Sequence, residues 1–101
     1  MLTIILQSIG RTPLLRLNAL GADLPGTGWR KRENRIPGGS IKDRVAFHVI
    51  DKTMEWGDIE AGGTIVEATS GNLGIGIALE AAVRGLHSLL TMPDSMSVER
   101  R

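Results

Sequence analysis

Apolar residues recur with a helical period between residues 41 and 56. The repeating positions are Ile41, Val45, Val49, Ile50 and Met54. Gly57 follows the last of them, as is typical of a helix C-terminus. At the other end, Ser40 has the chemistry of an N-cap, and Asp43 stands three residues later, close to a capping box. We therefore predict a helix from Ile41 to Trp56.

A second set of apolar patterns follows this helix. Thr64–Ala68 is rich in β-branched residues and predicts a strand. Residues 75–83 predict an apolar helix that closes at Gly85, and residues 87–92 predict a second strand that Pro93 stops. Strand, helix and strand at this spacing predict a βαβ unit and hence a parallel sheet.

The pattern is weaker before residue 37. Residues 1–7 fit a short strand or a short helix equally well, whereas Leu14–Leu17 predicts a short, mostly buried strand. The run Trp29–Arg35 is too short for a helix and too charged for a central strand. We interpret it as a solvated loop or edge segment rather than an anion or nucleic-acid patch, because it lacks interleaved aromatic residues.

Composition narrows the class of protein. The chain has 101 residues, which is enough for one small domain, and its net charge of +1 gives no reason to expect nucleic acid or a membrane surface as partner. It has no cysteine, and His48 and His87 lie too far apart in sequence to suggest a metal site. No apolar run approaches the roughly 18 residues of a membrane span. With no signal peptide at the start, we expect a cytoplasmic protein.

The last residues indicate that more structure belongs to this fold. Val98–Arg101 would begin another helix at the point where the chain ends. A parallel sheet of so few strands leaves edges and faces uncovered. We therefore expect an α/β fold with a partial parallel sheet, in which residues 1–101 are an incomplete amino-terminal α/β region of a larger α/β protein.

The turn before the first long helix carries one candidate for chemistry. Residues 37–40, Pro-Gly-Gly-Ser, place Lys42 in the first helical turn. That end of a helix is the positive end of its dipole and prefers anions to cations. Lysine is the residue that forms Schiff bases with carbonyl cofactors such as pyridoxal phosphate. The alternative interpretation is an ordinary solvated lysine on an exposed turn.

The turn between the first strand of the βαβ unit and its helix carries the second candidate. Open α/β sheets bind ligands at this position, where backbone N–H groups and the helix dipole favour an anion. Thr69 and Ser70 add hydroxyl groups, Asn72 adds an amide, and Gly71 and Gly74 allow close approach. An ordinary capped turn remains the alternative. The glycine spacing fits neither a dinucleotide fingerprint nor a Walker loop.

Four segments, IGRTPLLRL, PGGSIKDR, EATSGNLGIGIAL and TMPDSMSVERR, occur in this order between Ile9 and Arg101. Together they resemble the amino-terminal part of the cysteine synthase (O-acetylserine sulfhydrylase) family. This family belongs to the fold-type II pyridoxal-phosphate enzymes, which also include cystathionine β-synthase. The resemblance implies pyridoxal 5'-phosphate as cofactor, an amino-acid substrate and sulfide as small-molecule partners, and a homodimer for the full-length enzyme.

The resemblance also implies roles for individual residues. Lys42 would be the Schiff-base lysine and the carrier of the substrate's α-proton, and Asn72 would hydrogen-bond the cofactor's ring hydroxyl oxygen. Thr69, Ser70 and Gly71, together with Asn72, would hold the α-carboxylate. The implied reaction is a β-replacement through an aminoacrylate, from O-acetyl-L-serine and sulfide to L-cysteine and acetate. Two alternatives stay open: a related β-replacement or β-elimination enzyme, and a catalytically silent truncated α/β module.

The sequence departs from the family pattern at several positions. Leu73 stands where the family has a threonine, so one hydroxyl of the carboxylate loop is lost. Two residues separate Asn34 from Pro37, which are adjacent in the family. The charged run Trp29–Arg35 replaces an apolar strand, and a local reading-frame disruption is one hypothesis that resequencing would test. The family's phosphate-binding loop lies beyond this chain's end.

Overall fold

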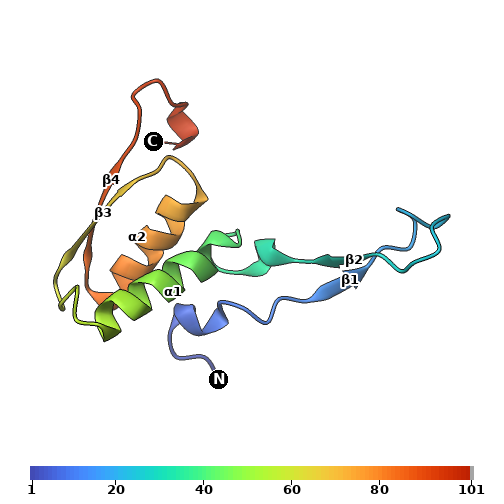
Figure 1. Ribbon diagram of the computed structural model, residues 1–101, viewed down its shortest axis with the longest axis horizontal. Coiled ribbons are helices and arrows are strands. Elements are labelled where there is room, and N and C mark those ends of the chain that lie inside the picture. Colours follow the sequence, from blue (N-terminus) through green and yellow to red (C-terminus); the bar gives the residue numbers. More distant parts are fainter. Residues whose placement is uncertain (101) are drawn as a thin grey trace.

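The computed structural model describes residues 1–100, which form a body of two helices and two parallel strands and a long arm that projects from it (Figure 1). The elements are η1 (Ile5–Ser8), β1 (Leu14–Arg16), β2 (Trp29–Lys31), η2 (Glu33–Arg35), α1 (Lys42–Glu55), β3 (Thr64–Ala68), α2 (Asn72–Arg84), β4 (His87–Thr91) and η3 (Val98–Arg100). The helix expected from Val98 is this 3-10 turn, and Arg101 lies outside the described residues.

The predicted βαβ unit is present. β3 and β4 pair in parallel, in a register that runs from Thr64 opposite His87 to Ala68 opposite Thr91. The connection between them is α2, which ends at Gly85 with a left-handed φ of 68°. The α/β fold class is therefore confirmed. Within residues 1–100, no helix is both long and apolar enough to cross a membrane.

Helix α1 confirms the predicted helix within one residue at each end, but the capping box expected at its start is not formed. Ile41 already has helical backbone angles, with φ of −55° and ψ of −17°, so Ser40 directly precedes the helical backbone. Its hydroxyl accepts a hydrogen bond from the N–H of Lys42 at 3.2 Å, and its carbonyl accepts one from the N–H of Asp43 at 3.2 Å. Asp43 closes no capping box, because its carboxylate turns back to Gly38 instead.

The core lies where α1, α2 and the inner face of the β3–β4 sheet meet. Its fully buried members are small or aliphatic, and they are Ala46, Ile50, Ile77, Ala81 and Leu86. Ile65 and Leu90 reach this core from the two strands. On the other face of the sheet, Val66 and Leu89 stand opposite each other and remain 63% and 56% exposed. The expectation that the sheet leaves a face uncovered is therefore confirmed.

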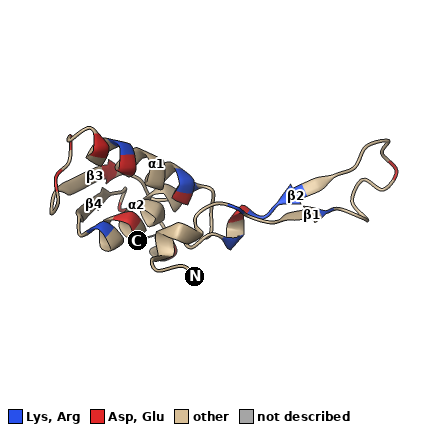
Figure 2. Cartoon of the chain, turned by 90° about the horizontal axis from the view of Figure 1, so that it is seen from below, with Lys and Arg blue, Asp and Glu red and all other residues tan. Residues whose placement is uncertain are grey.

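The arm is a two-stranded antiparallel ribbon of β1 and β2, with Leu14 opposite Lys31 and Arg16 opposite Trp29 (Figure 1). The strand predicted at residues 14–17 exists, but the prediction that it is mostly buried is wrong. Leu14 and Leu15 are 62% and 50% exposed, because the ribbon projects from the body and neither face meets the core. β2 carries Arg30 and Lys31 into solvent, as expected for an edge segment (Figure 2).

A network of polar side chains joins the base of the arm to α1. Glu33, in the charged run, accepts hydrogen bonds from Arg44 Nε at 2.7 Å and Nη2 at 3.0 Å. The Thr12 hydroxyl donates to the same carboxylate at 2.6 Å, and Lys31 Nζ lies 3.6 Å from it. The hydrogen bonds from Arg44 and, to a smaller extent, from Thr12 lower the pKa of Glu33 to about 2. The charged run thus supplies the acid that fixes the arm to the body.

The Glu33 contact predicts a pH dependence of stability. The pKa of the Glu33 carboxyl group falls from 4.5 to about 2 on folding. Its contribution to the unfolding free energy is therefore complete above pH 4.5 and disappears as the pH falls to about 2. We expect Glu33→Gln, in the complete gene product that carries these residues, to lower the unfolding free energy at pH 7 and to match the unmodified protein near pH 2. Urea titrations at several pH values measure this difference.

The matched control for Glu33 is Glu55→Gln, which removes an exposed partner of Lys52. Exposed ion pairs contribute little, so we expect this control to change the unfolding free energy by less than about 1 kcal/mol at any pH. A difference between Glu33→Gln and the unmodified protein that stays constant from pH 7 to pH 2 would contradict the role given to the carboxylate.

Candidate functional site

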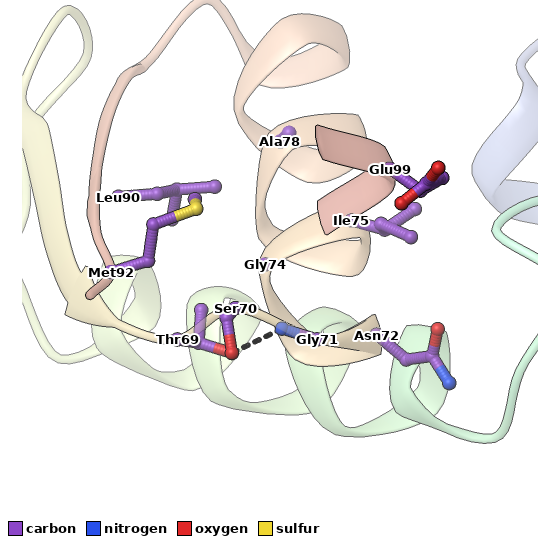
Figure 3. A pocket seen from close by; sticks show the side chains of 10 residues that line it. All are labelled: Thr69, Ser70, Gly71, Asn72, Gly74, Ile75, Ala78, Leu90, Met92 and Glu99. Carbon is purple, nitrogen blue, oxygen red and sulfur yellow. Dashed lines mark hydrogen bonds between the residues drawn. The ribbon is translucent and has the colours of Figure 1, made fainter. Parts of the chain in front are cut away.

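The turn between β3 and α2 opens into a pocket of about 480 Å³ (Figure 3). Its walls are Thr69, Ser70, Gly71, Asn72, Gly74, Ile75, Ala78, Leu90, Met92 and Glu99. The pocket lies at the carboxyl ends of two parallel strands and at the start of a helix, where open α/β sheets bind ligands. Four of the five site residues predicted from the sequence are part of this wall.

The backbone of this turn leaves hydrogen-bond donors open. The N–H of Thr69 donates to the carbonyl of Thr91 at 3.0 Å, which extends the strand pairing into the turn. The Thr69 hydroxyl accepts from the N–H of Gly71 at 3.2 Å (Figure 3). Within residues 1–100, no side chain caps α2 and no acceptor contacts the N–H groups of Asn72 and Leu73. These free donors and the helix dipole suit an anionic group.

Asn72 lies on the side of α2 that meets the start of α1. It stands one turn before Gly76, so the two share a helix face. A Cβ atom on Gly76 would lie 3.1 Å from the Lys42 carbonyl oxygen and 3.0 Å from Ala46 Cβ. The amide of Asn72 points away from Leu90, toward the edge of the pocket (Figure 3). The two helix starts named from the sequence are therefore neighbours.

Lys42 is exposed in the first turn of α1, and its side chain has no hydrogen-bond or ion-pair partner among residues 1–100. Its backbone approaches α2, but Lys42 is not part of the pocket wall. The structure thus gathers Thr69, Ser70, Gly71 and Asn72 around one pocket and leaves Lys42 beside it. That Lys42 and Asn72 face a common cleft stays a prediction.

Two neighbours of the turn differ from what the sequence suggested. Leu73 packs against the hydrophobic core instead of lining the pocket, so its side chain takes no part in the wall. Glu99, from η3, lines the pocket although the sequence analysis did not single it out. A hydrogen bond from its own backbone and one from the Ser97 hydroxyl lower its pKa, so it stays anionic. Only the folded chain shows this proximity, since Glu99 lies 27 residues after Asn72.

Comparison with known proteins identifies relatives over nearly the whole chain. Residues 5–101 match the model of a family described as "Pyridoxal-phosphate dependent enzyme". Cysteine synthase B of Escherichia coli (strain K12) is 46% identical over 95 residues, which is 94% of this chain and 31% of that protein. The chain thus spans about a third of the length of this curated relative.

Solved structures give the same picture. A crystal structure of O-ureido-L-serine synthase matches with a TM-score of 0.90 and 42% identity, over 100% of this chain and 32% of that one. A hydrogen sulfide-producing enzyme from Fusobacterium nucleatum matches with a TM-score of 0.93 and 38% identity, over 99% of this chain and 33% of that one. The arm, the βαβ unit and both turns therefore lie within the matched region.

Proposed function

The chain belongs to the family of pyridoxal-phosphate dependent enzymes, and from this we propose that it forms the amino-terminal α/β region of a cysteine synthase. The proposed enzyme converts O-acetyl-L-serine and sulfide into L-cysteine and acetate by β-replacement. The observation that supports it most is the pair of adjacent helix starts. One presents Lys42, which has no partner among the described residues, and the other presents Asn72 beside open backbone donors. The 46% sequence identity to cysteine synthase B also supports the proposal.

The side chains at these helix starts fit pyridoxal 5'-phosphate. Its aldehyde requires an accessible amine, and Lys42 is exposed and has no partner among residues 1–100. Its ring oxygen requires a donor, and the Asn72 amide makes no hydrogen bond within the same residues. When bound, the cofactor supplies an electron sink for negative charge at the α-carbon of an amino acid.

The chain's own residues would then hold the cofactor and the substrate. Lys42 would hold the cofactor covalently and carry the α-proton at its Nζ atom. Asn72 would donate to the ring oxygen and fix the plane of the ring. Thr69, Ser70 and the N–H groups that open α2 would donate to the substrate's α-carboxylate. Glu99, anionic at the pocket wall, would disfavour a second negative charge on the substrate at that side.

A second candidate function is another β-replacement or a β-elimination on an activated serine, as in cystathionine β-synthase. This candidate is favoured because the similar solved structures include enzymes with different reactions, an O-ureido-L-serine synthase and a hydrogen sulfide-producing enzyme. A panel of O-acetyl-L-serine, L-serine and L-cysteine, each tested with and without sulfide, separates these reactions. For each of these reactions, we propose that the active enzyme is a longer, homodimeric protein that contains this chain. A silent α/β module would turn over none of them.

The proposed function is tested by trapping the cofactor on the protein. We expect the complete gene product, mixed with pyridoxal phosphate and reduced with borohydride, to carry one stoichiometric adduct on Lys42 in peptide mass spectra. Lys42→Ala is the matched control and should carry none. Labelling scattered over Lys31, Lys42 and Lys52 would contradict a dedicated site. The same reaction on residues 1–101 alone shows whether this region forms the site without the rest.

A further inference from the structure

The first turn of α1 is held from one side by the turn that precedes it. Asp43 is 1% exposed, and its Oδ2 atom accepts a hydrogen bond from the N–H of Gly38 at 2.5 Å. The other oxygen, Oδ1, lies where the Cβ atom of any larger residue at position 38 would stand. The backbone of residues 37–40 is therefore fixed against the first helical turn, one residue from Lys42.

The same turn of α1 is also in contact with α2. A Cβ atom on Gly76 would lie 3.1 Å from the Lys42 carbonyl oxygen and 3.4 Å from the Asp43 Cα atom. Ala46 Cβ would lie 3.0 Å away, so a methyl group at position 76 would be crowded by three atoms of α1. Because two of these atoms belong to the backbone, we expect the methyl group to shift the first turn of α1 relative to α2 by a few tenths of an ångström.

One oxygen of the Asp43 carboxylate is buried at a cost to the fold. Among the described residues, Asp43 Oδ1 is buried without a hydrogen-bond partner. Burying a carboxylate oxygen in this way has a desolvation cost. An acidic residue does interact favourably with the helix N-terminus, but an exposed one does so without that cost. A positioning role would account for the burial of Asp43 despite this cost.

We propose that Gly38, Asp43 and Gly76, here called the Lys42 clamp, are positioning residues that fix Lys42 relative to Asn72. The inference rests on the proposed function, in which both residues bind one cofactor. Gly76 lies one turn after Asn72 on the same helix, so the contact between α1 and α2 sets the separation of the two side chains. The hydrogen bond from Gly38 to Asp43 then sets the direction in which the first turn of α1 leaves its loop.

The experiment compares Gly76→Ala, Asp43→Ala and Asp43→Asn in the complete gene product at limiting pyridoxal phosphate. A misplacement of about 1 Å can cost about a hundredfold in a positioned reaction. A shift of a few tenths of an ångström is smaller, so we expect the rate of borohydride-trapped labelling on Lys42 to fall by about threefold to tenfold in the two alanine variants. Asp43→Asn keeps an oxygen that can accept from Gly38 and should restore the rate. Gly26→Ala is the control, since a methyl group there meets no atom within 4 Å.

Equal Lys42 labelling in all variants would overturn the proposal, as would a loss in Asp43→Asn as large as in Asp43→Ala. If an alanine variant fails to fold, hydrogen exchange of the Gly38 amide in the unmodified protein tests the clamp instead. The Gly38 amide should exchange far more slowly than in an open chain, and open-chain exchange would overturn the clamp. This readout needs no cofactor, whereas absence of any adduct on Lys42 in the unmodified protein would overturn the proposed function.

Discussion

Replacing Lys42 by arginine in the complete gene product is expected to reduce turnover of O-acetyl-L-serine with sulfide by about a thousandfold or more. Arginine keeps the positive charge, but it stays protonated and so provides no nucleophilic amine and no proton acceptor. Positioned acid–base groups alone contribute about a hundredfold to ten-thousandfold. Because the Lys42 side chain is exposed and makes no hydrogen bond or ion pair within residues 1–100, thermal unfolding of the cofactor-free protein should stay unchanged.

Steady-state assays of cysteine formation measure the Lys42 effect, and Lys52→Arg serves as the control. Lys52 lies on the same helix, and in the described part of the chain its side chain pairs only with the exposed Glu55, so this variant should keep full activity. Activity of Lys42→Arg close to that of Lys52→Arg would show that the lysine is an ordinary surface residue. The unfolding temperature separates this outcome from a loss caused by misfolding.

The features that follow from local chemistry were predictable from the sequence. The β-branched run at Thr64–Ala68, the glycine that closes α2 and the apolar face of α1 each act within a few residues, and the βαβ unit followed from their order. The residues of the turn before α2 were also predictable as a group, because a strand and a helix that meet at a turn place them together.

The remaining features depend on partners that are distant in sequence. Leu14 is apolar, yet it is exposed because β1 pairs only with β2 in the arm. Glu33 looked like part of a solvated run, and its two-point contact with Arg44 depends on how the arm returns to α1. Asp43 has the spacing of a capping residue, but a nearby glycine N–H is its partner instead. No periodicity in the sequence encodes such contacts.

The second large expected effect concerns a buried ion pair at the end of α2. Arg84 Nε lies 2.8 Å from Glu80 Oε2, and Arg84 Nη1 lies 3.1 Å from Asp51 Oδ1. The guanidinium also stacks over the ring of Phe47, 5.3 Å from its centroid. Glu80 is fully buried, and its Oε1 atom has no partner among the described residues. Burial raises the pKa of Glu80, while the contact with Arg84 acts in the opposite direction.

We expect Arg84→Ala to lower the unfolding free energy of the complete gene product by about 3 kcal/mol at pH 7, because it leaves a buried carboxylate without its partner. Because the pKa of Glu80 is raised in the folded protein, its carboxyl group contributes most to stability below the unfolded-state pKa of 4.5. That contribution is lost as the pH rises through the folded-state pKa. Removing Arg84 raises this pKa further, so the loss should shrink as the pH falls toward 4.5. Denaturant titrations at pH 7 and 5 measure both effects.

A double variant shows whether the uncompensated charge is the cause. Arg84→Ala combined with Glu80→Leu removes the buried carboxylate as well, so we expect it to be more stable at pH 7 than Arg84→Ala alone. Arg16→Ala, on the exposed strand β1, is the control and should change the unfolding free energy by no more than about 0.5 kcal/mol. If the double variant is less stable than Arg84→Ala, the uncompensated charge of Glu80 is not the cause of the loss.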